Sequence, residues 1–188
     1  MSKSEREKML AGELYFAFDP ELSEMHAKAQ QLLHVFNNSL PSQVKEREEI
    51  INQLFGAIGQ NSTVKPPFFC DYGCHIFAGE KLFINYDCVI LDCNRVHIGN
   101  NVFLAPKVQI YTAYHPLEPD IRRTDLELAA PIIIGDDVWI GGGAIICPNV
   151  EIGAGTTIGA GSVVTRSIPP NVFAAGNPCR VIREINQG

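Results

Sequence analysis

The stretch Ile134–Thr165 reads IGDDVWIGGGAIICPNVEIGAGTTIGAGSVVT and repeats with a period of six residues. An aliphatic residue opens each repeat: Ile134, Ile140, Ile146, Ile152, Ile158 and Val164. A six-residue period is typical of a parallel β-helix, in which each repeat forms a short strand and a turn and neighbouring coils share one apolar core. Amphipathic helices and half-buried strands have other periods. The stretch therefore predicts a mainly β protein built as a parallel β-helix.

The same repeat extends toward the N-terminus in a less regular form. Small or aliphatic residues recur at six-residue steps from Ala78 to Ile90 and again from Ile98 to Ile110. Two extra residues separate these runs. We expect the β-helix to span residues 62–168, beginning near a pair of prolines.

A charged segment, residues 116–131, interrupts the repeat. The phase is kept across it, because Ile110 and Ile134 lie 24 residues apart, a multiple of six. Insertions in solenoids form loops on one face, often the binding face, so we expect a protruding loop here. After the last repeat, Pro169-Pro170 cannot donate ladder hydrogen bonds and is expected to end the sheet, which leaves residues 169–188 as a tail.

The first part of the chain, residues 1–61, carries signals for helices. They include a capping box, an N-cap followed by proline at the first helical position, and two apolar stripes with helical spacing. The third helix is expected to open at Pro41-Ser42 and close at Gly59. We predict a helical N-terminal extension packed on the first coils. The residues that carry the capping signals are Ser4 with Glu7 and Asp19 with Pro20.

Composition narrows the class of protein. No apolar run approaches the ~20 residues of a membrane span, and the charged N-terminus lacks a signal-peptide pattern, so we expect a soluble cytoplasmic protein with no membrane partner. A net charge of −6 and a pI near 5.3 argue against a nucleic-acid partner. The six cysteines are scattered, which favours reduced, buried thiols over a zinc site.

Six motifs are spread over the chain: MLAGELY at 9–15, Asp71-Tyr72-Gly73, Asn85-Tyr86-Asp87, Ala113-Tyr114-His115-Pro116, Asp137-Val138-Trp139-Ile140-Gly141 and the segment 175–182. In this order they resemble the motifs of the maltose and galactoside O-acetyltransferases, within the hexapeptide-repeat acyltransferases. This resemblance covers essentially the whole chain. It implies a left-handed β-helix, a homotrimer with active sites between subunits, acetyl-CoA as the donor and the 6-hydroxyl of a sugar such as maltose or glucose as the acceptor.

Acetyl transfer to a hydroxyl needs a base and a donor to the developing oxyanion. Histidine has a pKa suited to the first task, and His115 closes the last repeat before the insertion. The resemblance implies that His115 is the general base and Asn85 the oxyanion donor, a task for which a neutral amide is suited. From position alone, a solvated turn histidine and a turn asparagine remain alternatives.

The residues that bind the acceptor sugar in the family are matched less completely in this sequence. The resemblance implies Asp71 and Asn85 as acceptor ligands, together with Asp19 and Asp92. Ala17 stands where the galactoside enzymes carry an acid near the first helix, and Cys93 stands where they carry the second of two adjacent acids. These departures favour the maltose branch.

The resemblance also implies a binding slot for coenzyme A, with no metal. Small residues allow the backbone to approach the pantetheine arm, and arginines pair with phosphates. From the residues alone, an interface tryptophan and solvated arginines remain alternatives. The implied donor-binding residues are Trp139, Gly142, Ala160, Thr165, Arg166, Arg180 and Arg183.

Two other functions are weighed against this one. In a hexapeptide-type carbonic anhydrase, His97 and His115, 18 residues apart, would stack on successive coils and share a zinc ion with a third histidine. His75 is out of phase with them, which argues against that site. A non-catalytic solenoid used for assembly is the second alternative, and the presence of both His115 and Asn85 argues against it.

Overall fold

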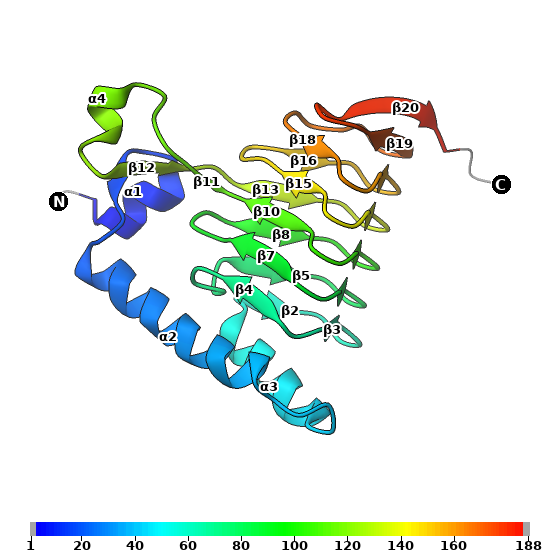
Figure 1. Ribbon diagram of the computed structural model, residues 1–188, viewed down its shortest axis with the longest axis horizontal. Helices are drawn as coiled ribbons and strands as arrows, with labels where there is room; N and C mark the ends of the chain where they lie inside the picture. The colour runs from blue at the N-terminus through cyan, green and yellow to red at the C-terminus, as the bar shows by residue number, and fades with distance from the viewer. Residues whose placement is uncertain (1–2, 186–188) are drawn as a thin grey trace.

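A computed structural model describes residues 3–185, and these form a parallel β-solenoid (Figure 1). Each coil contributes one strand to each of three sheets, so the predicted β-helix is confirmed. The first sheet contains β2 (Ala57–Ile58), β5 (Ile76–Ala78), β8 (Val96–Ile98), β13 (Ile132–Ile134) and β16 (Glu151–Ile152). The second contains β3 (Thr63–Val64), β6 (Phe83–Ile84), β9 (Phe103–Leu104), β14 (Trp139–Ile140), β17 (Thr157–Ile158), β19 (Val172–Ala175) and β20 (Arg180–Glu184). The third contains β4 (Phe68–Cys70), β7 (Cys88–Leu91), β10 (Gln109–Tyr111), β15 (Ile145–Ile146) and β18 (Val163–Val164).

The repeated aliphatic residues form the core. Ile84, Leu104, Ile140 and Ile158 are paired in parallel register, and each is fully buried. Burying one such side chain stabilises the fold by roughly 1.5–3 kcal/mol. The stacked ladder therefore explains why the six-residue period is kept so strictly.

Coil length changes along the solenoid. Ile84 pairs with Leu104, 20 positions further on, whereas Ile140 pairs with Ile158, 18 positions further on. The early coils therefore carry two additional residues each. In the β7-to-β8 coil they lie in the turn that contains Asp92 and Cys93, between the third and first sheets.

The turns between the first and second sheets need a residue in the left-handed region. Asn101 (φ 55°), Asp137 (φ 58°) and Gly155 (φ 68°) hold equivalent places there. Asparagine, aspartate and glycine tolerate this conformation best. Turn composition thus supports the same register as the core.

The N-terminal extension contains α1 (Glu5–Ala11), α2 (Pro20–Asn37) and α3 (Val44–Leu54). The capping box at the start of α1 and the N-cap of α2 are confirmed. The expected limits of the third helix are wrong, since it begins at Val44 and ends at Leu54. The backbone becomes extended after Leu54 because residues 57–58 form β2, which pairs with β5. The first solenoid strand therefore lies inside the range 1–61 that was expected to be helical.

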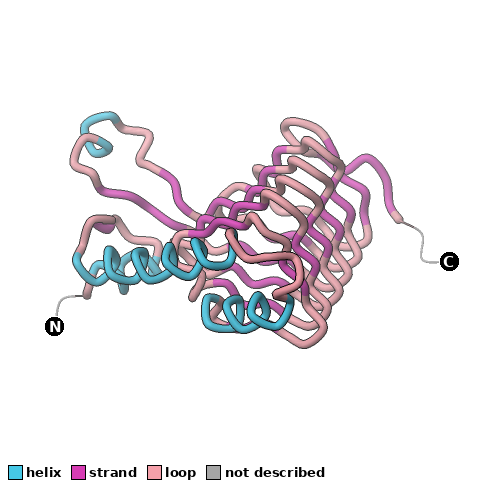
Figure 2. Tube along the Cα trace, turned by 60° about the horizontal axis from the view of Figure 1, so that its bottom comes forward, coloured by secondary structure: helices cyan, strands magenta, loops and turns pink. Residues whose placement is uncertain are grey.

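The insertion forms an arm that stands away from the solenoid (Figure 2). It consists of β11 (Ala113–Tyr114), α4 (Pro119–Arg122) and β12 (Leu126–Ala129). Strand β12 pairs antiparallel with β11 and with β1 (Tyr15–Phe16) near the N-terminus. The segment 116–131 is thus more than a loop, because it contains a short helix and a strand, β12, that pairs the arm with β1 of the N-terminal extension.

The expected end of the sheet at Pro169-Pro170 is wrong. These prolines lie in a turn, where the Pro169 carbonyl accepts a hydrogen bond from the Thr156 hydroxyl, and no ladder N–H is needed from them. Strand β19 continues the second sheet in parallel with β17, and β20 folds back antiparallel on β19. Residues 186–188 of the expected tail lie outside the described residues.

The composition-based expectations can be compared with the fold. No helix within residues 3–185 is long and apolar enough to cross a membrane. All six cysteines are free thiols, and four of them are buried. Burial raises the pKa of Cys88 to about 11, as expected for an unreactive core thiol.

Candidate active site

A pocket of about 560 Å³ lies where the third sheet meets the arm and the N-terminal extension. We call the turns between the third and first sheets, with the arm, the His115 edge. His115 follows β11 at this edge and is exposed. Side chains from five segments of the chain converge there. The pocket-lining residues used below are Ala17, Phe18, His26, Asp71, Cys93, His115 and Glu127.

Asp71 lines this pocket, and a buried neighbour holds its turn in place. The Asp92 carboxylate accepts hydrogen bonds from the backbone N–H groups of Asp71 (3.1 Å), Tyr72 (2.9 Å) and His75 (3.2 Å). Asp92 is fully buried and does not line the pocket. The expectation that Asp92 is an acceptor ligand is therefore corrected, because its oxygens are taken up by the backbone.

The environment of Asp71 disfavours its ionised form. Burial raises the pKa of Asp71 above its ordinary value, and the negative charges of Asp92 and Glu127 add to this effect. The Cys93 thiol, which donates to Asp71 Oδ2 at 3.3 Å, and His26 act in the opposite direction. A ligand that donates hydrogen bonds to this carboxylate is expected to favour its charged form.

Asp19 does not line the pocket. Its side chain accepts a hydrogen bond from Glu21 N–H at 3.0 Å as the N-cap of α2. Ala17 and Phe18, just before it, face the pocket instead. The expected role of Asp19 as an acceptor ligand is therefore replaced by a structural role.

Sequence reasoning missed Glu127 and Tyr15. Glu127 Oε2 accepts a hydrogen bond from the Tyr15 hydroxyl at 2.9 Å, and the two residues are also register partners in β1 and β12. They are 112 positions apart, and the pairing of β1 with β12 follows no hexapeptide period. The charged composition of the arm was the only sequence signal for such a residue.

Asn85 lies at a different edge of the solenoid. It follows β6 in the turn to the third sheet, and we call this row of turns the Asn85 edge. Backbone hydrogen bonds stack its turn on those of Ala105 and Gly141, and stack Gly142 on the turn that holds Ala160 and Gly161. Asn85 thus shares an edge with two predicted donor-binding residues.

The other predicted donor-binding residues are divided between locations. Trp139, which is 54% exposed, lies on β14 in the second sheet, just before the chain reaches the Asn85 edge. Thr165 and Arg166 follow β18 at the His115 edge, and Arg180 and Arg183 lie exposed on β20. The predicted site residues of one chain are therefore divided mainly between two edges on either side of the third sheet, with Arg180 and Arg183 apart from both on β20.

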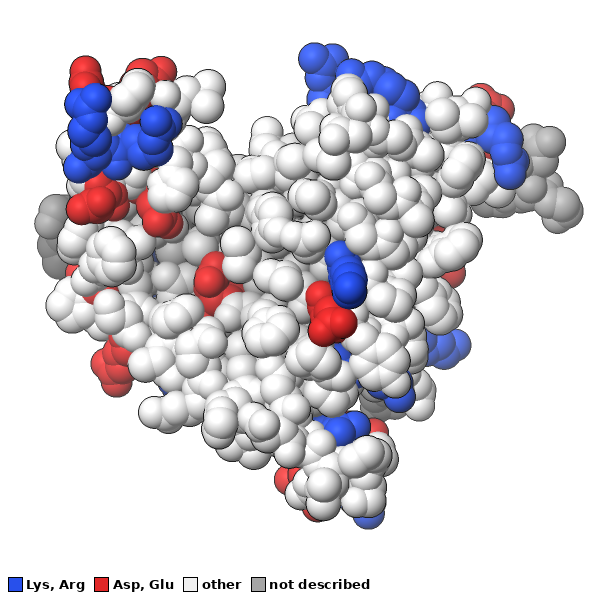
Figure 3. All heavy atoms as spheres, in the orientation of Figure 1, with Lys and Arg blue, Asp and Glu red and all other residues white. Residues whose placement is uncertain are grey.

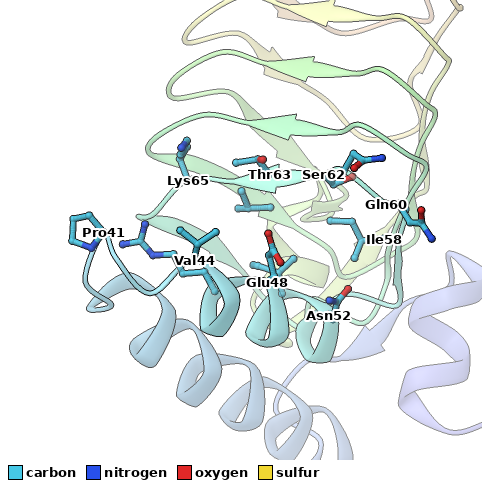
Figure 4. A pocket seen from close by; sticks show the side chains of 14 residues that line it. Pro41, Val44, Glu48, Asn52, Ile58, Gln60, Ser62, Thr63 and Lys65 are labelled. Carbon is cyan, nitrogen blue, oxygen red and sulfur yellow. The ribbon is translucent and has the colours of Figure 1, made fainter.

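A second pocket, of about 460 Å³, lies between α3 and the first coil (Figure 4). Val44, Glu48 and Asn52 face it from α3, and Ser62 and Lys65 from the solenoid side (Figure 4). None of the predicted site residues lines it. Of these two pockets, the one at the His115 edge is therefore the one that predicted site residues line, namely Asp71 and His115.

The arrangement needed for the carbonic anhydrase alternative is not found. His97 pairs with Phe77 and Ile133 on the first sheet, and its ring stacks on Phe77 at 5.2 Å. His115 instead lies beyond β11, so the two histidines do not follow each other in one ladder. Within residues 3–185, no group of three or more His, Cys, Asp or Glu residues is arranged to hold a metal ion.

Two family models match the chain. The maltose acetyltransferase hexapeptide capping motif matches residues 8–59, and the bacterial transferase hexapeptide model, six repeats, matches residues 131–166. The galactoside O-acetyltransferase of Escherichia coli is 43% identical over 180 residues, which cover 96% of this chain and 89% of that protein.

Solved structures agree with these matches. A maltose O-acetyltransferase from Clostridium difficile has a TM-score of 0.98 and 49% identity, covering both chains completely. A galactoside acetyltransferase in complex with coenzyme A has a TM-score of 0.96 and 42% identity, covering 98% of this chain and 92% of that one. The chain therefore belongs to the maltose and galactoside O-acetyltransferase family of hexapeptide-repeat acetyltransferases.

Proposed function

We propose that this chain transfers an acetyl group from acetyl-CoA to a sugar hydroxyl, with His115 as the general base. The observation that carries the proposal is the position of His115 in a pocket with Asp71 and Glu127. An imidazole can take a hydroxyl proton near neutral pH, and the carboxylates can accept hydrogen bonds from the other hydroxyls of a sugar.

In the proposed reaction, His115 removes the proton as the sugar oxygen attacks the thioester carbonyl. The Asn85 amide donates to the oxyanion of the tetrahedral intermediate. Collapse of the intermediate breaks the carbon–sulfur bond, and the histidine returns its proton to the thiolate of coenzyme A. The products are an acetylated sugar and free coenzyme A, so protons and atoms balance.

We further propose that the active unit is a homotrimer, because the two groups of site residues lie at different edges. A neighbouring copy would bring its Asn85 edge to the His115 edge of the first. The outward side chains of the third sheet lie between these edges, and none of them is charged: Phe69, Val89, Leu91, Gln109, Tyr111, Ile145 and Val163. The face seen in Figure 3 is correspondingly poor in charge across the solenoid. Closed symmetric assemblies bury such faces.

The residues at the Asn85 edge suit a long, thin donor. A Cβ added at Gly142 would lie 3.2 Å from the Pro106 carbonyl oxygen, so a side chain here would crowd the edge. Trp139 offers an exposed aromatic surface beside it. We propose that Trp139, Gly142 and Ala160 bind the pantetheine arm from one copy, with Thr165 and Arg166 of the next copy across the slot.

The proposal is tested by following coenzyme A release with a panel of neutral sugars, with mass analysis of the acetylated product. Wild-type protein is expected to acetylate at least one sugar. His115→Ala should retain donor binding in a calorimetric titration and lose turnover. Thioester hydrolysis at the same rate with and without sugar would contradict the proposal.

A further inference from the structure

Two carboxylates in the His115 pocket each accept a hydrogen bond from a buried side chain that has a single proton to donate. The Tyr15 hydroxyl donates to Glu127 Oε2 at 2.9 Å, and the Cys93 thiol donates to Asp71 Oδ2 at 3.3 Å. Tyr15 is fully buried and Cys93 is 6% exposed. Neither donor has a second proton to offer a ligand, so their role is to orient the carboxylates.

The other oxygen of each carboxylate is left for a ligand. Among residues 3–185, no hydrogen bond is made to Asp71 Oδ1 or to Glu127 Oε1. Both residues are half-buried and line the same pocket. The two carboxylates also lie near enough for the charge of Glu127 to raise the pKa of Asp71.

The charge of the pocket lining is one-sided. Its lining residues include Asp71 and Glu127 but no lysine or arginine. The basic side chains among the lining residues are the two histidines, His26 and His115. A negatively charged acceptor would therefore meet two carboxylates and no lysine or arginine in the part of the pocket lining that this chain supplies.

We propose that Asp71 and Glu127 select the acceptor by charge, favouring a sugar that carries a protonated amine over a neutral sugar and excluding anionic sugars. This inference rests on the proposed function, since the pocket is taken as the acceptor site. An ammonium group bridging Asp71 Oδ1 and Glu127 Oε1 would relieve the repulsion between the carboxylates. Hydrogen bonds between charged partners contribute more than neutral ones.

Glu127 is then a specificity-determining residue, and Tyr15 a positioning residue that acts through it. Replacing Glu127 by glutamine preserves its shape and removes its charge. Tyr15→Phe preserves most of the packing and frees the carboxylate to rotate. Glu118 is an exposed acid of the same arm and outside the pocket lining, so Glu118→Gln is a matched control.

The test compares 2-aminoglucose, methyl glucoside and glucose 1-phosphate by calorimetric binding in the presence of coenzyme A and by turnover with acetyl-CoA. Wild type should bind the amine about tenfold more tightly than the neutral sugar, the size expected for one charge-assisted hydrogen bond. The phosphate should bind more weakly still. Glu127→Gln should remove most of this preference, Tyr15→Phe should reduce it, and Glu118→Gln should leave it unchanged.

Binding and turnover separate the two proposals. An equal affinity for the three sugars, or an amine preference that survives in Glu127→Gln, would overturn the charge proposal whatever the turnover. The predicted order of affinities with no acetylation of any sugar would support the charge selection and contradict the proposed reaction.

Discussion

Asn85 and His115 lie at opposite edges of the third sheet of one chain. Asn85 occupies the turn that leads into this sheet, and His115 follows the short strand beyond its exit. An oxyanion donor and a general base must both reach one reacting centre. If both act in one site, the site must draw them from two copies of the chain.

A subunit-complementation experiment tests this directly. His115→Ala and Asn85→Ala are each expected to be nearly inactive, but mixed assemblies contain sites with an intact residue from each copy. Random assortment should restore about a quarter of wild-type activity. Wild type mixed with the His115→Ala/Asn85→Ala double variant is the control for the effect of subunit exchange alone. No recovery in mixtures shown by mass to be hybrid would place both residues in one subunit's site.

His115→Ala should lower kcat by about 10²–10⁴-fold, the range for removing a general base. The affinity for acetyl-CoA should change little, because the base acts on the acceptor. Steady-state kinetics and donor titration provide the measurement, with His34→Ala on the exposed side of α2 as a control. Near-normal turnover of the purified variant would remove His115 from the mechanism.

Asn85→Ala should lower kcat by about 10²–10³-fold, because an oxyanion donor acts mainly in the transition state. The KM for donor should be nearly unaltered. The side chain also accepts a hydrogen bond from Tyr86 N–H at 2.9 Å, so Asn85→Asp, which keeps that acceptor but cannot donate, separates turn structure from catalysis. A change confined to KM would show a binding role instead.

Assembly should depend on the outer face of the third sheet. We expect wild type to have the mass of a trimer by light scattering, and Val89→Glu to dissociate it and abolish activity. Val35→Glu, on an exposed apolar position of α2, should leave assembly intact. An active Val89→Glu monomer would contradict the division of the site between copies.

Arg180 and Arg183 are expected to act on the phosphates of coenzyme A. Both are exposed on β20, and the Arg183 guanidinium lies 5.9 Å from the Phe173 ring centre. Changing either to Glu should raise KM for acetyl-CoA more than for the dephospho donor, and the effect should shrink with salt. Equal losses with both donors would return these arginines to a surface role.

Asp92→Ala should unfold more easily than wild type. Three backbone N–H groups in the turn lose their acceptor, and a buried unsatisfied donor costs about 1–3 kcal/mol, so a loss of roughly 2–4 kcal/mol is expected. Asp120→Ala, an exposed position on the arm, should change stability by less than about 0.5 kcal/mol. Denaturant melts of both variants make the comparison, and equal midpoints would refute the supporting role of Asp92.

The sequence by itself determined the parallel β-helix and the helix caps, whereas the pairing of His115 with Asn85 is a prediction from the resemblance of their motifs to the family. The β-helix is predictable because each coil contributes one aliphatic residue, such as Ile84, Leu104 or Ile140, to the same apolar column, so the pattern recurs at short range in the sequence. Caps depend only on neighbours in the chain, as the Ser4–Glu7 box shows. The prediction that the six-residue phase continues after the arm is also confirmed, since Ile98 pairs with Ile134 and Ile110 with Ile146.

Only the tertiary structure decided what surrounds the site. The burial of the Asp92 carboxylate against three backbone N–H groups and the Tyr15–Glu127 hydrogen bond depend on contacts that no six-residue period encodes. The same holds for the placement of Asn85 and His115 at separate edges. The period records which residues point into the core, whereas the site depends on which turns and distant strands meet outside it.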